Sequence, residues 1–394
     1  MRIPMKRRKR TDCSSDTMKD LSLDCGCLLI RLLRPLGIRA QAKPRRFDGI
    51  ATAIKSREYR ASLQGLFAQR FRVRHSIHSR THMKIVCLAL LVGGIPAMAP
   101  ACDLCSLYST SPTSSTEPGI FAGVSEQFTH FGTLQDNGVR VDNEVGQYLD
   151  SSVSHVFVGY TISPRASVQF NLPVIYREFS RPRGSVIDSG VESGIGDASL
   201  TGTLSVLRTK SGDFSLNWEL LGGVKFPTGD SSRLAEEEIV NDPPLPPSGI
   251  GGHDLALGSG SFDGIFGSTI VASWGRCFGS GSFQYTLRSE GDFHHQHADD
   301  VMWWAGPGYR VYERDSSRLS LQLVVSGDTK DKDTMDGETD GDSAASAIYL
   351  GPQVEVGWRR FISVFAVDVP VSVRNSGLQV VPDYRLRLSL LWRF

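Results

Sequence analysis

The chain has 394 residues, and its 43 Lys and Arg against 42 Asp and Glu give a formal net charge of only +1. This balance hides two unlike parts, because residues 1–82 carry 20 basic and 6 acidic residues, which leaves 23 basic and 36 acidic residues for 83–394. The remainder is rich in Gly, Ser, Thr and aromatic residues, which is typical of a sheet protein with many turns. Seven Cys in 394 residues exclude a small disulfide-stapled scaffold.

Residues 1–82 form a basic extension without a sustained period of 2 or 3.6 residues. Such a basic run can bind nucleic acid. The segment that follows favours another interpretation, namely that the start was assigned too far upstream or that the extension is disordered and not part of the folded protein. We therefore expect no nucleic-acid partner.

Residues 83–101 have the order of parts of a secretory signal peptide. Met83-Lys84 supplies a basic start, residues 85–95 supply a short apolar run, and Ala97-Met98-Ala99 supplies a small-residue cleavage site. The apolar run has about eleven residues and is too short to cross a bilayer as a helix. We expect translation to start at Met83 and the mature chain to be exported.

Residues 102–118 are expected to form a periplasmic N-terminal segment with a Cys-x-x-Cys pair, Cys102 and Cys105. In an oxidising compartment this pair can close a local disulfide or hold a metal, although two thiolates are only half of a tetrahedral zinc site. Cleavage before Cys102 would also expose it for lipidation, but the residues before it form a poor lipoprotein signal.

From Gly119 onward, apolar and polar residues alternate in segments of about ten or more residues, the length that a tilted strand needs to cross a bilayer. There are twelve: 119–131, 151–162, 165–175, 195–207, 213–226, 261–274, 278–290, 300–313, 317–327, 346–358, 361–373 and 383–394.

The connections between these segments fall into two alternating classes. Short ones lie at 163–164, 208–212, 275–277, 314–316 and 359–360. Long ones lie at 132–150, 176–194, 227–260, 291–299, 328–345 and 374–382. Short periplasmic turns and long external loops are the pattern of outer-membrane barrels. We therefore predict an all-β fold for residues 119–394, a transmembrane antiparallel up-and-down β-barrel of about 12 strands in the outer membrane of a Gram-negative cell.

The last segment, Tyr384–Phe394, alternates apolar and charged residues except at Leu391. Its apolar face would meet outer-membrane lipids, which are the first expected partner. A terminal aromatic after such a strand resembles the signal read by the barrel-assembly machinery. Phe394 is therefore the candidate assembly signal, and that machinery is the second expected partner.

Charged residues on the polar faces of the segments are predicted to face the lumen. They are Glu219, Lys225, Arg288, Arg310, Glu355, Asp368, Arg385 and Arg387. The arginines of the last strand can select solutes by charge. Alternatively, they balance Glu219, Glu355 and Asp368 across the lumen.

Two of the long loops carry further signals. The loop 227–260 is long enough to fold into the lumen as a constriction, or to remain mobile outside the cell. The loop 328–345 is acidic and invites a calcium interpretation. However, an EF-hand register from Asp336 places Ala347 where the bidentate Glu belongs, so that motif fails.

A histidine cluster lies in the loop 291–299, where His294, His295 and His297 are weak metal candidates together with the Cys pair. Three His in a flexible loop more often have no specific role, and we expect no cofactor. His155 and His253 occur with many Ser, but no Gly-x-Ser-x-Gly elbow is present, so no catalytic set and no enzyme activity are predicted.

Three stretches resemble the outer-membrane channel family associated with meta-pathway phenol degradation. They are the apolar-Pro-apolar step at 169–174, the Gly-x-Gly-Asp strand start at 194–200 and the Lys-x-Pro-Thr-Gly-Asp strand exit at 223–230. The resemblance implies a channel for passive uptake of small hydrophobic or aromatic solutes. The alternatives are a non-channel barrel with a metal-linked binding or structural role, and an outer-membrane lipid hydrolase.

Overall fold

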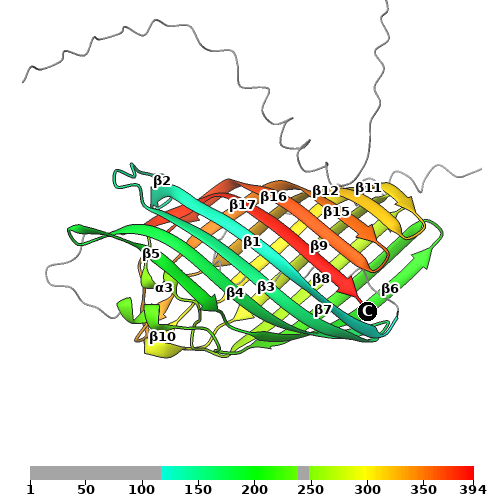
Figure 1. Cartoon of the computed structure of the whole chain (residues 1–394), viewed down its shortest axis with the longest axis horizontal. Coiled ribbons are helices and arrows are strands. Elements are labelled where there is room, and N and C mark those ends of the chain that lie inside the picture. The colour runs from blue at the N-terminus through cyan, green and yellow to red at the C-terminus, as the bar shows by residue number, and fades with distance from the viewer. Residues whose placement is uncertain (1–116, 238–247) are drawn as a thin grey trace, which may run out of the picture. The chain divides into compact units, whose positions relative to one another are not determined.

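The protein is seen here in a computed structural model that describes residues 117–237 and 248–394. Twelve long strands pair antiparallel in chain order, and the last also pairs with the first, so the sheet closes into a barrel (Figure 1). They are β1 (Gly119–Asp136), β3 (Tyr148–Ser163), β4 (Ala166–Arg183), β6 (Ser199–Ser211), β7 (Phe214–Lys225), β8 (Asp263–Trp274), β9 (Cys277–Leu287), β11 (Asp300–Arg314), β12 (Ser317–Lys330), β15 (Ala345–Trp358), β16 (Phe361–Asn375) and β17 (Leu378–Arg393). The predicted all-β barrel of twelve strands is confirmed.

The shorter elements gather in the connections at one end, which we call the loop end (left in Figure 1). The other end, where two-residue turns join the strands and the chain terminates, is the turn end. The short elements are β2 (Val139–Arg140), β5 (Val186–Ile195), β10 (His295–Gln296), β13 (Thr334–Met335), β14 (Glu338–Thr339), η3 (Ser232–Glu236), η4 (Asp292–His294) and α3 (Gly252–Leu255). Of the helices in the described ranges, none has the length and apolar character to cross a bilayer.

Two of the predicted long loops are wrong. Residues 176–194 are a hairpin, because β4 continues to Arg183 and β5 returns along it in register from Val186 to Ile195. The alternation that marks β4 runs on through buried Ile175, Arg177 and Phe179, so the sequence signal was there to be followed.

The second error concerns residues 374–382. Strand β16 reaches Asn375 and β17 starts at Leu378, so the connection is a tight turn. Gly377 adopts a φ of +61° in this turn, a conformation that favours glycine. The strands around the barrel are therefore longer than the alternation alone predicted.

The outer face of the barrel is apolar along its whole circumference. Large side chains such as Phe170, Leu220, Phe266, Leu323 and Val369 are between 40 and 53% exposed. A closed barrel leaves no strand edge for lipid to meet, and an apolar belt of this kind is what a bilayer requires. The chain is an outer-membrane β-barrel.

The inner face is mainly polar, as alternation requires, with one apolar patch near the turn end. Leu391, the residue that breaks the alternation of the last strand, points inward. It forms a buried cluster with Phe121 and Phe157, against which Ile362 packs. The exception in the sequence therefore fills part of the lumen instead of facing lipid.

The two faces of β15 predict losses of stability of different size when a residue is replaced by arginine. Leu350→Arg places a charge on the lipid side and should lower the free energy of unfolding by about 2–4 kcal/mol. Gln353→Arg, three residues along and on the inner face, should change it by less than about 1 kcal/mol. Denaturant unfolding of the protein folded into lipid vesicles measures both. Equal losses would contradict the assigned faces.

Candidate functional site

The connection between β7 and β8 is described at residues 226–237 and 248–262. These parts fold into the barrel at the loop end, and we call them the inward loop. In its described parts, Leu234, Ile250 and Leu255 are at most 1% exposed. Ile250 and Leu255 form a buried cluster with side chains of the surrounding strands, namely Leu134, Leu149, Phe179 and Val380. Of the two interpretations of this loop, folding into the lumen is therefore the one that the described residues show.

Buried arginines on β4 hold the inward loop by its backbone. Arg177, only 1% exposed, donates from Nη1 to the carbonyl oxygens of Asp254 (2.6 Å) and Ala256 (2.8 Å). Arg181 donates to the carbonyl of Ile250 and pairs with Glu236 at 2.5 Å. Sequence analysis missed both arginines because it ended this strand at residue 175.

The two glycine-containing motifs that suggested a channel family interlock at the root of the inward loop. Asp197, between β5 and β6, accepts backbone hydrogen bonds from Gly229 and Ser259, each 3.0 Å long. Its carboxylate also lies 2.5 Å from Lys225 Nζ at the end of β7. One carboxylate therefore fixes both the entry and the exit of the loop.

Close backbone approach completes this junction. The Thr228 hydroxyl donates to the carbonyl of Gly196 and accepts from the N–H of Ala198. A Cβ added to Gly229 would lie 2.6 Å from the carbonyl oxygen of Leu257, and one added to Gly258 would lie equally close to Gly229. Only glycine lets the two arms of the loop pack this closely.

Side chains of alternating charge lie next to one another at the loop ends of β7, β8, β9 and β11. We call these four residues the charged belt: Lys225, Asp263, Arg288 and Asp300. Lys225 Nζ and Arg288 Nη1 each lie 2.8 Å from Asp263 Oδ2, and Arg288 Nη2 lies 2.6 Å from Asp300. All four side chains are less than 10% exposed. A small pocket of about 30 Å³ lies beside the belt.

The other charged residues predicted for the lumen lie in three further places: beside Asp368, at Glu219, and at the turn end. Arg385 and Arg387 on β17 both bind Asp368, at 3.1 and 2.6 Å, and Arg385 also binds Asp328. These arginines therefore balance Asp368, which is the plainer of the two roles considered for them. Glu219 stands apart, and its carboxylate accepts a 2.7 Å hydrogen bond from Asn217.

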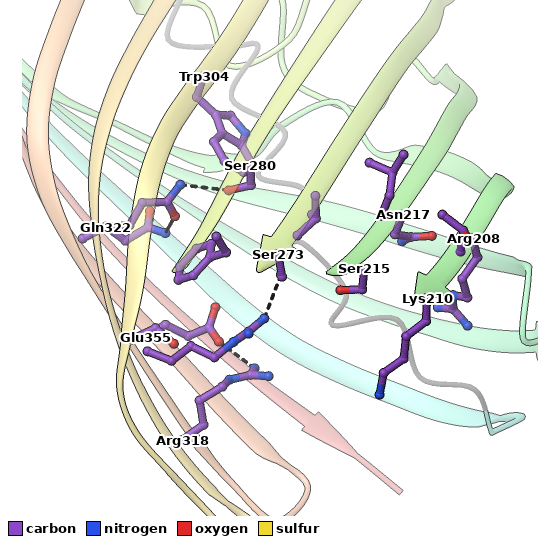
Figure 2. A pocket seen from close by; sticks show the side chains of 17 residues that line it. Arg208, Lys210, Ser215, Asn217, Ser273, Ser280, Trp304, Arg318, Gln322 and Glu355 are labelled. Atoms are coloured by element: carbon purple, nitrogen blue, oxygen red, sulfur yellow. Dashed lines mark hydrogen bonds and ion pairs between the residues drawn. The ribbon is translucent and has the colours of Figure 1, made fainter. Parts of the chain in front are cut away.

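At the turn end, a cavity of about 390 Å³ is lined by residues of β6, β7, β8, β9, β11, β12 and β15 (Figure 2). We call it the turn-end cavity. Arg318 and Glu355, on the adjacent strands β12 and β15, form an ion pair of 2.6 Å in its wall. Arg310 donates to Ser273 and lies over the ring of Phe278, 5.6 Å from its centroid. The remaining lining residues include Arg208, Lys210, Ser280, Trp304, Gln322 and Gln353.

The turn-end cavity combines cations with aromatic side chains. Trp304 and Phe278 occupy inward positions of β11 and β9, where the alternation calls for polar residues. Sequence analysis did not single them out, although aromatic residues on a polar face were the signal available. Together with Arg310 they form a surface that suits a flat apolar solute.

The histidine cluster divides into exposed and buried members. His294 is 70% exposed and hydrogen bonds to Glu290. His295 and His297 are 1 and 3% exposed and lie beside Asp333, so the prediction of a wholly flexible loop is wrong for them. Cys102 and Cys105 lie outside the described residues.

A partly buried ion pair ties α3 to the preceding part of the inward loop. His253 Nδ1 lies 2.9 Å from Glu237 Oε1. Burial lowers the pKa of His253, but the carboxylates of Asp254 and Glu237 outweigh it and raise the pKa to about 10. Burial likewise raises the pKa of Glu237, but the hydrogen bond and charge of His253 hold it at about 2.

Comparisons with known proteins support the architecture. No protein-family model matches the sequence, and no curated protein matches it. The structure is similar to an outer membrane channel from Pseudomonas putida F1, with 18% identity, a TM-score of 0.51, and coverage of 72% of this chain and 98% of the channel. A toluene transporter from Ralstonia pickettii, TbuX, matches at 9% identity and a TM-score of 0.28 over 71% of this chain and 90% of its own. At these identities the first likeness establishes the fold alone.

Removing the cation at the root of the inward loop should free the loop from its anchored position inside the barrel. Lys225→Met leaves Asp197 and Asp263 buried with less compensation, so we expect the free energy of unfolding to fall by about 3–5 kcal/mol. The loop should also become sensitive to protease in folded barrels. Arg314→Met, which removes an exposed ion pair, is the control and should cost no more than about 1 kcal/mol. A protease-resistant loop in Lys225→Met would contradict this anchoring role.

The His253–Glu237 pair predicts a pH window for loop docking. The raised pKa of His253 stabilises the folded state fully below 6.5, and this contribution is lost as the pH rises towards about 10. The lowered pKa of Glu237 contributes fully above 4.5 and is lost as the pH falls towards about 2. Unfolding free energies should therefore fall between pH 6.5 and 9.5. His253→Gln should flatten this slope, and an unchanged slope in that variant would refute the assignment.

Proposed function

We propose that this outer-membrane barrel is a passive channel for small aromatic or otherwise apolar solutes. The observation that carries the proposal is the turn-end cavity, which places Trp304, Phe278 and Arg310 inside a closed barrel. The two aromatic side chains, on strands that otherwise turn polar residues inward, supply apolar surface that a path for inorganic ions alone would not need.

Two further observations support a channel. The fold is similar to that of a protein described as an outer membrane channel. The motifs at 194–200 and 223–230, which resemble those of phenol-pathway channels, are the residues that hold the inward loop in the lumen. The proposal therefore gives the motifs a structural reason, since they hold the loop that narrows the lumen.

Passage would require the constriction to yield. The charged belt adjoins only a small pocket of about 30 Å³, and the inward loop packs on the strands at the loop end. A solute of benzene size would move only when the loop shifts. The contacts between Asp197 and Lys225 at the root of the loop would oppose such a movement.

The same constriction favours a second candidate, a barrel that conducts nothing and serves as a binding or structural protein. A hydrolase has less support, because neither ring nitrogen of the buried His155 has a hydrogen-bond partner. A histidine that acts as a general base needs a nucleophile within hydrogen-bonding distance and a partner that orients it.

Solute flux through protein reconstituted in liposomes tests the channel. We expect a phenol-sized aromatic solute to enter faster than a sugar of similar size. Ser320→Trp, which places a bulky ring at the wall of the turn-end cavity, should reduce that flux several-fold. Leu321→Trp, the next residue on the lipid side, should leave it unchanged. Flux equal to that of empty liposomes would decide for the non-conducting barrel.

A further inference from the structure

Two loops at the loop end meet in a small sheet of their own. Strand β10 lies between β9 and β11, and it pairs with β13, which lies between β12 and β15, through His295↔Met335 and Gln296↔Thr334. This pairing sets Asp333 beside the two histidines that flank Gln296. One donor atom from each of His295, His297 and Asp333 falls within 4.8 Å of the other two.

The three side chains are buried, and apart from the 3.1 Å hydrogen bond between His297 Nδ1 and Asp333 Oδ2, hydrogen bonds leave the histidine nitrogens unaccounted for. Their exposed fractions are 1% for His295, 3% for His297 and 0% for Asp333. Both ring nitrogens of His295 and the Nε2 of His297 lack a hydrogen-bond partner. Polar groups buried without partners are unfavourable, and they are rare unless an ion or a water molecule satisfies them.

The simplest competing explanation is an ion pair. Lys330 Nζ lies 2.6 Å from Asp333 Oδ2, and the backbone N–H of Ala298 donates to Asp333 Oδ1 at 2.8 Å. These contacts explain why Asp333 is buried. They do not explain His295, whose Nε2 lies 3.7 Å from the same carboxylate and is directed to no other acceptor or donor.

We propose that His295, His297 and Asp333 bind a divalent transition-metal ion of the zinc type, with water completing a tetrahedral site. Imidazole nitrogen and carboxylate oxygen are ligands that such ions prefer. Ligand atoms around a tetrahedral zinc ion lie about 3.4 Å apart. The observed separations from Asp333 Oδ2, 3.1 Å to His297 Nδ1 and 3.7 Å to His295 Nε2, lie on either side of that value.

The ion would clamp the loop end. It joins the β9–β11 connection to the β12–β15 connection through side chains alone. His295 also stacks on His253 of α3 in the inward loop, with ring centroids 6.5 Å apart. Metal binding therefore stabilises the arrangement in which the inward loop is folded into the barrel, and Lys330 competes with the metal for Asp333.

The test uses the full mature protein with Cys102→Ser and Cys105→Ser, so that these thiolates cannot bind the added metal. Equilibrium dialysis against Zn²⁺ should give one ion per barrel, and Co²⁺ should give the visible absorption of a tetrahedral site. His297→Gln should weaken Zn²⁺ binding by about 10-fold or more. Lys330→Met should tighten it, because the competing ammonium is gone. His294→Gln, the exposed neighbour, should bind as the parent does.

Two outcomes overturn the proposal. One is the absence of both stoichiometric Zn²⁺ and a tetrahedral Co²⁺ spectrum in the folded parent that lacks Cys102 and Cys105. The other is a loss of affinity in His294→Gln that equals the loss in His297→Gln. If His297→Gln fails to form a barrel, the Co²⁺ spectrum of the parent and the affinity of Lys330→Met still decide.

Discussion

The hydrogen bonds between β1 and β17 are the constraint on which the rest of this structure depends. Lipid offers no partner for a backbone N–H or carbonyl, so a sheet in the bilayer must have no free edge. Closure fixes which face of each strand meets lipid and which faces the lumen. Because alternate residues are then committed to opposite solvents, even a single exception such as Leu391 has a structural consequence inside the barrel.

A polar lumen gives the protein a means of holding a loop that an apolar core would not. Asp197, Lys225, Asp263 and Arg288 are buried, yet each is compensated by opposite charges or backbone donors. Buried charges of this kind are poor sources of stability but strong determinants of geometry. The inward loop is therefore positioned by directional contacts at its root and by apolar packing of Ile250 and Leu255 further along.

The two ends of the lumen differ in how far side chains fill them. The loop end is filled by side chains and by a small sheet that brings buried histidines to Asp333. The turn end is open enough to hold a cavity of about 390 Å³ with aromatic and cationic walls. The lumen is therefore packed at one end and hollow at the other.

The sequence by itself determined the barrel, its twelve strands and the inward direction of Lys225, Arg288 and Asp368, because a period of two residues is a local property of a strand. It did not determine how far β4 and β16 extend, since polar turn residues and strand residues look alike beyond the bilayer. Only the tertiary structure decided that Arg177 grips the inward loop and that His295 meets Asp333, because these residues are 77 to 79 and 38 positions from their partners. Contacts over such separations depend on where the closed barrel places each loop, and no local pattern records that.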